Sequence, residues 1–152
     1  MRISNIVLGV LCAGLMVSSV SYALDGTEDF VEKVYSKKER KAIEKLGVEA
    51  ELLSNLQAIQ TAQAAYESNF DIFVSANQYP TSPSSKGVEW VNKDAGGFAD
   101  LGWAPDGKVR GAYSVTTTSI DFTAIGIGDI DGDGTMETYR ATKSVNAQSK
   151  ID

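Results

Sequence analysis

The sequence contains no histidine, and its only cysteine is Cys12. The absence of histidine removes the side chain that most often serves as a general base and as a transition-metal ligand. A single cysteine cannot form a disulfide within the chain, so stability must come from packing and, in one interpretation, from a bound ion. The sequence also contains no nucleophile elbow and no zinc signature. A hydrolase therefore has little support, and we expect a protein that is not an enzyme.

Acidic residues outnumber basic residues by 20 to 14, which gives the chain of 152 residues a formal charge of −6. An acidic surface is repelled by the phosphates of nucleic acids, so we expect no nucleic-acid partner. The length is sufficient for one domain with a sizeable core.

The N-terminus has the three parts of a secretory signal peptide. Arg2 forms a positive n-region, residues 6–20 form an apolar h-region, and residues 21–23, Ser-Tyr-Ala, match a small-x-small cleavage site. The apolar run is shorter than the ~20 residues of a membrane-spanning helix, which disfavours the alternative of an uncleaved anchor. We therefore predict that residues 1–23 are a signal peptide and that the exported chain starts near Leu24, without a stable membrane anchor.

Charged residues of both signs come next in the sequence. Residues 24–35 form an acidic N-terminal segment, and Lys37, Lys38, Arg40 and Lys41 then form a basic group. One interpretation is a solvated helix start, because charge groups of this size are common on exposed helices. The alternative is a contact of the basic group with acidic residues of a partner or with lipid headgroups.

A long amphipathic helix is predicted to begin at Ser36 and to end near Asn69. Ser36 and Glu39 have the spacing of a capping box, which marks a helix start. Gly47 costs about 1 kcal/mol relative to alanine inside a helix, which permits a bend or a break. Apolar residues recur at spacings of three and four and are predicted to form one buried stripe. The stripe consists of Ile43, Leu46, Ala50, Leu53, Leu56, Ile59, Ala62 and Tyr66.

Residues 75–107 are rich in Asn, Pro, Ser and Gly, which predicts long loops with at most short strands. Large apolar side chains in this region are expected to pack on the helix as core rather than to form a ligand platform, because such side chains are mostly buried. They are Trp90, Phe98, Leu101 and Trp103.

The last third of the sequence alternates between apolar and polar residues. Residues 112–117, 121–127 and 135–142 are predicted to form three strands joined by short connections, hence an antiparallel meander that packs one face on the helix. The fold class is therefore α+β, a long N-terminal helix packed against a small antiparallel β-sheet. We assign residues 36–142 to this globular domain and residues 143–152 to a flexible C-terminal tail.

A candidate metal site lies between the last two predicted strands. Asp129, Asp131 and Asp133 stand at positions one, three and five of a calcium-loop pattern, with glycine at position six. Position twelve is an arginine instead of the usual bidentate glutamate, so Glu137 at position nine would complete a weaker calcium site. The alternative is a tight Asp-Gly turn that binds no metal.

Three ordered blocks fall within residues 48–139: VEAELLSNLQAIQTAQAAYESN, LGWAPDGKVRGAYSV and FTAIGIGDIDGDGTMETY. Together they resemble the globular head domain of type IV pilins and pseudopilin-like proteins of the delta-proteobacterial type. The resemblance implies a pilin-like head with a structural or accessory role, without enzymatic activity, in a type IV pilus or a related secretion filament.

The N-terminal part of the sequence departs from the pattern of this family. Type IV pilins carry a prepilin-peptidase site and then ~20 apolar residues that form the hydrophobic spine, whereas this sequence has a signal-peptide pattern. The resemblance therefore implies a head that pairs with a separate short pilin or with other pilus subunits, in the periplasm, at the cell surface or on the pilus. The alternative is a free exported calcium-binding adhesin or binding module.

Pairing with a short pilin requires an uncovered apolar strip near the helix start. We expect Val34, Ile43 and Leu46 to form this strip. The competing expectation is that the acidic residues 24–32 fold back over the same strip and leave a self-sufficient monomer.

Overall fold

The computed structural model describes residues 35–149. By its internal contacts the chain divides into two units, Met1–Ile43 and Glu44–Asp152. The described part of the first unit includes the start of helix α3, and the second unit contains the rest of that helix and all the strands. The predicted signal peptide, nearly all of the acidic segment and the end of the predicted tail lie outside the described residues, as does Val34. No helix within the described part is both long and apolar enough to cross a membrane.

Helix α3, Lys37–Phe70, has nearly the predicted bounds and the predicted N-terminal cap. The backbone N–H of Ser36 donates to Glu39 Oε2 at 2.8 Å, and the N–H of Glu39 donates to Ser36 Oγ at 3.3 Å. These bonds satisfy donors that a helix start leaves free. Hydrogen bonds from the Ser36 side chain and backbone lower the pKa of the Glu39 carboxyl. The helix continues through Gly47, so the break that the sequence permitted there does not occur.

The buried face of α3 differs from the predicted stripe in the N-terminal half of the helix. Leu56 and Ile59 are buried as predicted, but Ile43, Leu46 and Ala50 are exposed, which corrects the prediction. The helix carries apolar residues along two neighbouring lines, and only one of these lines faces the sheet. The buried line consists of Val48, Leu52, Leu56, Ile59 and Gln63, and Leu53, Ala62 and Tyr66 are partly buried beside it.

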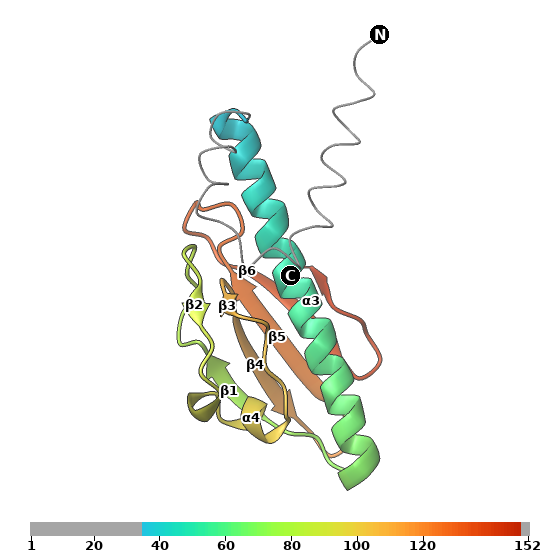
Figure 1. Cartoon of the computed structure of the whole chain (residues 1–152). Coiled ribbons are helices and arrows are strands. Elements are labelled where there is room, and N and C mark those ends of the chain that lie inside the picture. Colours follow the sequence, from blue (N-terminus) through green and yellow to red (C-terminus); the bar gives the residue numbers. More distant parts are fainter. Residues whose placement is uncertain (1–34, 150–152) are drawn as a thin grey trace. The chain divides into compact units, whose positions relative to one another are not determined.

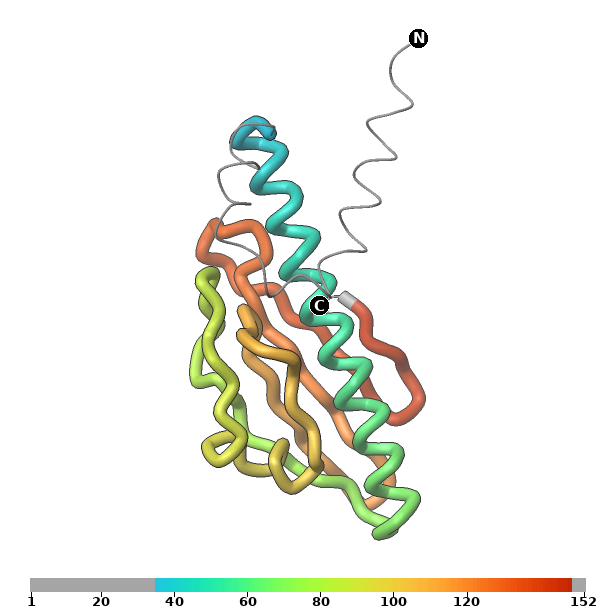
Figure 2. The backbone as a smooth tube through the Cα atoms, viewed as in Figure 1, coloured from blue at the N-terminus to red at the C-terminus, as the bar shows by residue number. Residues whose placement is uncertain are grey.

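Five antiparallel strands form the main sheet in the order β1-β4-β5-β6-β7. In the central three strands Tyr113 lies opposite Gly126, which lies opposite Tyr139, so the predicted meander is confirmed. In the second unit α3 runs along one face of this sheet (Figure 1), and the strands from β4 to β7 follow one another as hairpins (Figure 2). The α+β fold class is therefore confirmed. The strands are β1 Ala76–Tyr79, β4 Ala112–Thr117, β5 Phe122–Gly128, β6 Glu137–Thr142 and β7 Gln148–Ser149.

Two strands of this sheet were not predicted. β1 follows the helix and pairs with β4, and β7 pairs with β6 through Gln148 and Arg140. β7 lies within the segment that the sequence predicts as a flexible tail. The predicted loop region holds short elements, namely β2 Val88–Glu89, β3 Lys108–Val109, the 3₁₀-helix η1 Asn92–Asp94 and helix α4 Gly97–Asp100.

Small residues on the inner face of β5 allow the helix to approach the sheet closely. Every second residue of this strand is buried, from Phe122 to Gly128. A Cβ atom added to Gly126 would lie 3.3 Å from Leu56 Cδ1, and one added to Gly128 would lie 3.1 Å from Leu52 Cδ1. The leucines of α3 therefore occupy the space that larger side chains on β5 would fill.

The large apolar side chains of residues 90–103 belong to the hydrophobic core, as predicted. Phe98 and Trp103 are buried, and Trp90 packs against both, with ring centroids 5.5 and 5.2 Å away. Tyr113 of β4 completes the cluster, 5.8 Å from Trp103. These rings pack edge-on or tilted, the arrangement that aromatic quadrupoles favour.

The hydroxyl of Tyr113 also takes part in a polar link between α3 and β4. It accepts a hydrogen bond from Asn55 Nδ2 at 2.8 Å and donates to Glu51 Oε1 at 3.2 Å. The same carboxylate oxygen accepts the backbone N–H groups of Arg110 and Gly111. Burial, and then the charge of Glu51, raise the pKa of Tyr113. The buried polar groups at this contact are thus satisfied by one another.

Candidate functional site

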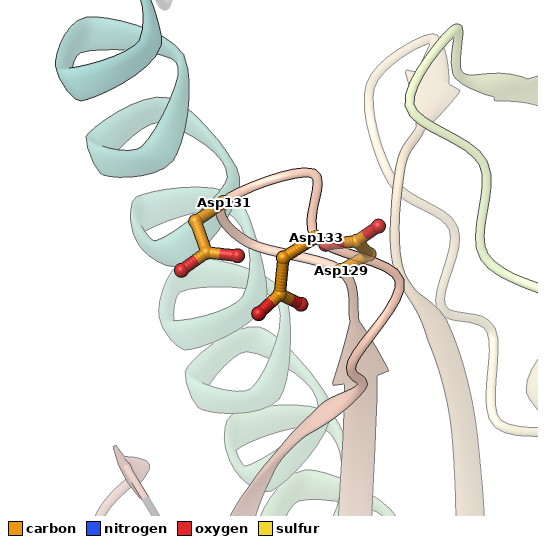
Figure 3. A group of neighbouring side chains, drawn as sticks. All are labelled: Asp129, Asp131 and Asp133. Carbon is orange, nitrogen blue, oxygen red and sulfur yellow. The ribbon is translucent and has the colours of Figure 1, made fainter.

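The β5–β6 loop brings three of the predicted ligands together. Carboxylate oxygens of Asp129, Asp131 and Asp133 all lie within 4.8 Å of one another. Figure 3 shows the three side chains on this one loop, with Asp131 beside α3. Asp129 and Asp131 are half-buried and Asp133 is exposed. Clustered carboxylate oxygens are the ligands that hard divalent cations prefer, so this cluster could bind a metal ion.

Hydrogen bonds within the loop hold two of these carboxylates in place. Asp129 accepts the N–H of Gly132 at 2.7 Å and that of Gly134 at 3.1 Å. Asp133 accepts the N–H of Thr135 at 2.6 Å, and this contact lowers the pKa of the Asp133 carboxyl. Both glycines have positive φ, 70° and 88°, which the sharp turn requires. The same bonds would also form in a tight turn that binds no metal, so they do not distinguish the two interpretations.

Asp131 differs from the other two aspartates. Its Oδ2 forms an ion pair with Lys45 Nζ of α3 at 3.7 Å. Its Oδ1 is buried and has no hydrogen-bond partner among the described residues. An unpartnered carboxylate oxygen is unfavourable unless something satisfies it, and a cation or a water molecule can do so.

Glu137, the fourth predicted ligand, lies at the start of β6 and is not part of the aspartate group. Its Oε2 accepts the backbone N–H of Ile130 at 3.1 Å. This bond joins the two ends of the loop. Glu137 therefore helps to shape the loop in this structure.

A second feature is the solvent-exposed side of α3 from Leu46 to Phe70, which carries no charged residue. Glu49, Glu51 and Glu67 are the charged residues from position 46 to the helix end, and all three are half-buried. Surface helices normally carry charged side chains opposite their buried face. We call this surface the uncharged face. It consists of Leu46, Ala50, Ser54, Gln57, Ala58, Thr61, Ala64, Ala65, Ser68, Asn69 and Phe70, all exposed.

The apolar strip predicted from the sequence covers only the N-terminal end of this surface. Of the three residues expected to form an apolar strip, Ile43 is 39% exposed and Leu46 is 59% exposed, while Val34 lies outside the described residues. The rest of the uncharged face consists mainly of small residues that a search for apolar stripes passes over. The signal available in the sequence was the small number of charged residues between Lys45 and the helix end, where Glu49, Glu51 and Glu67 are the only ones.

The chain matches no protein-family model, no curated protein sequence and no solved structure. A long helix packed on a small antiparallel sheet is nevertheless compatible with a pilin-like fold.

Proposed function

We propose that this protein is a pilin-like, non-enzymatic subunit, structural or accessory, of a type IV pilus or related secretion filament. In this proposal it pairs with a separate short pilin that consists mainly of an apolar spine helix. The observation that carries the proposal is the uncharged face of α3. The three sequence blocks that resemble pilin heads support the same assignment.

The uncharged face suits a helical partner for two physical reasons. A partner that covers it removes no charged group from water, so the desolvation penalty of an interface is low. Ala50, Ser54, Ala58, Thr61 and Ala65 are spaced four, four, three and four apart, which places small side chains along one side of the helix. Small side chains permit close approach of two helices. Leu46 and Phe70, 59% and 60% exposed, provide larger apolar contacts at the two ends of this surface.

Co-expression with the short pilin followed by pull-down tests the pairing. Ala58→Glu places a charge in the centre of the uncharged face, and Ala99→Glu makes the same change at an exposed position of α4. We expect Ala58→Glu to weaken capture of the short pilin at least about tenfold, because burying an unpaired carboxylate costs several kcal/mol. Ala99→Glu should bind like the wild type. Equal capture of the short pilin by both variants would remove the uncharged face from the interface.

Calcium is the ion that we propose for the aspartate cluster. All candidate ligands are oxygens and the chain has no histidine, which suits a hard cation. The unpartnered Asp131 Oδ1 is the specific observation that favours an ion over the bare turn. In this role calcium offsets repulsion among the three carboxylates and holds the β5–β6 loop.

The aspartate cluster also keeps the second candidate function open, a free exported calcium-binding adhesin or binding module. A free module would be recovered from the periplasm or cell surface without pilus subunits. In the pilin-like proposal the exported chain is recovered together with the short pilin.

A further inference from the structure

We infer that the first turns of α3 bind the anionic lipid headgroups of a membrane surface. The residues concerned are Lys37, Lys38 and Lys41, which we call the basic start, and all three are exposed. This inference goes beyond the proposed pairing with a short pilin and does not depend on it.

The charge of the basic start is opposite to that of the protein as a whole. The three lysines of the basic start and Glu39 together carry a local charge of +2, whereas the whole chain carries −6. The one acidic residue, Glu39, is engaged by Ser36 in the capping box. An anionic surface therefore attracts the basic start, although the protein as a whole is acidic.

The position of these cations on the helix supports an anionic ligand. The N-terminus of a helix carries a partial positive charge, so lysines there weaken the helix, as does the repulsion between Lys37 and Lys41 one turn apart. An anion close to the first turn relieves both effects. Ile43 follows in the next turn and is 39% exposed, which provides one apolar side chain beside the cations.

The chemistry of lysine favours a lipid surface over a single acidic protein site. Lysine binds as a hydrated point charge on a flexible stem, whereas arginine offers a planar fork that matches one carboxylate in fixed geometry. Arg40 lies in the same turns and has interactions of its own. A layer of phosphate headgroups places no geometric demand on its partner, and polybasic segments bind such layers.

Sedimentation with lipid vesicles tests the inference. The exported chain is mixed with vesicles of phosphatidylcholine alone or of phosphatidylcholine with phosphatidylglycerol, at about 0.1 M salt, where charges interact over about 10 Å. We expect binding to the vesicles that contain phosphatidylglycerol and no binding to the neutral ones. Raising the salt should release the protein.

Two triple variants locate the binding surface. Lys37→Gln/Lys38→Gln/Lys41→Gln removes the basic start, and Lys86→Gln/Lys93→Gln/Lys108→Gln removes three other exposed lysines and changes the net charge equally. Each basic side chain near an anionic surface strengthens binding about fivefold, so we expect the first variant to bind about 100-fold more weakly. The second variant should lose much less. Melting curves of both variants confirm that they fold.

Three results would overturn the inference: equal loss in both variants, binding to neutral vesicles, or no binding of the wild type to phosphatidylglycerol. In the last case, binding of soluble polyglutamate at the basic start would identify an acidic protein as the partner instead. The short-pilin pull-down, repeated with the first variant, separates this inference from the proposed function, because loss of lipid binding should leave that capture unchanged.

Discussion

The two sides of α3 in the second unit carry different kinds of residue, although both are poor in charge. The side that faces the sheet has large apolar residues, such as Leu52 and Leu56, which pack against glycines of the sheet. The exposed side has mainly alanine, serine and threonine between Leu46 and Phe70. The first pattern is that of a core, and the second is that of a surface which tolerates close contact with another helix. The difference shows that an uncharged helix face need not be buried in the core of its own domain.

The largest expected effect is on the free energy of unfolding, when a leucine on each side of α3 is replaced by alanine. Leu56 is fully buried and Leu46 is 59% exposed. Leu56→Ala should lower the free energy of unfolding by about 3 kcal/mol, because it removes buried apolar atoms and leaves a cavity. Leu46→Ala should change it by less than about 0.5 kcal/mol. Urea unfolding of the isolated protein measures both, and equal losses would show that Leu46 is covered by its own chain.

A pair of glutamines extends the comparison to polar groups. Gln63 is fully buried, its Oε1 accepts the N–H of Val74 at 3.0 Å and its Nε2 donates to the Val74 carbonyl at 2.6 Å. Gln63→Leu should cost about 2 kcal/mol, because both backbone groups lose their partner. Gln57→Leu on the uncharged face should leave stability nearly unchanged. If urea midpoints show no difference between the two variants, the hydrogen bonds of Gln63 to Val74 do not stabilise the fold.

Calcium should stabilise the loop next to α3. Binding to the native state alone raises the melting temperature, and a calcium concentration ten times the dissociation constant adds about 1.4 kcal/mol. We expect a chelator to reverse the shift and Asp131→Asn to abolish it. Asp106→Asn, an exposed aspartate in another loop, should keep it. Identical melting curves of the wild type with calcium and with chelator would favour the bare turn.

The smallest expected effect is the loss of stability at alkaline pH caused by ionisation of the buried Tyr139. Burial, and then the charge of Glu49, raise the pKa of Tyr139 to about 12, above the ordinary value of 10.0. The unfolded chain then releases this proton at lower pH than the folded chain. Stability should be full below about pH 10 and fall by about 1 kcal/mol or more as pH rises toward 12. Urea unfolding at several pH values measures the slope. Tyr139→Phe should flatten it, and an unchanged slope would place the effect elsewhere.

The parts of the fold that depend on local sequence patterns could be predicted from the sequence alone. The bounds of α3, the Ser36–Glu39 cap and the strands β4, β5 and β6 follow from periodicity, capping chemistry and turn residues. Asp129, Asp131 and Asp133 came together as predicted because alternate residues of one short loop cannot lie far apart.

The parts that the sequence did not predict depend on contacts between distant segments. The buried line of α3 is selected by where Gly126 and Gly128 leave room for Leu52 and Leu56, which helix periodicity does not reveal. Gln63 is buried because Val74 offers it a donor and an acceptor. The short strands β1 and β7 are formed by pairing with the meander, since four and two residues give almost no pattern of their own.

Crosslinking in living cells is the most direct test of whether the uncharged face binds a short pilin. A photoreactive amino acid replaces Ala58 on this face or Ala99 on α4, both exposed in the structure. We predict a crosslinked product from position 58 in which mass spectrometry identifies the short pilin, and none from position 99. Crosslinks to the short pilin from position 99 but not from position 58, in cells that assemble the filament, would contradict it.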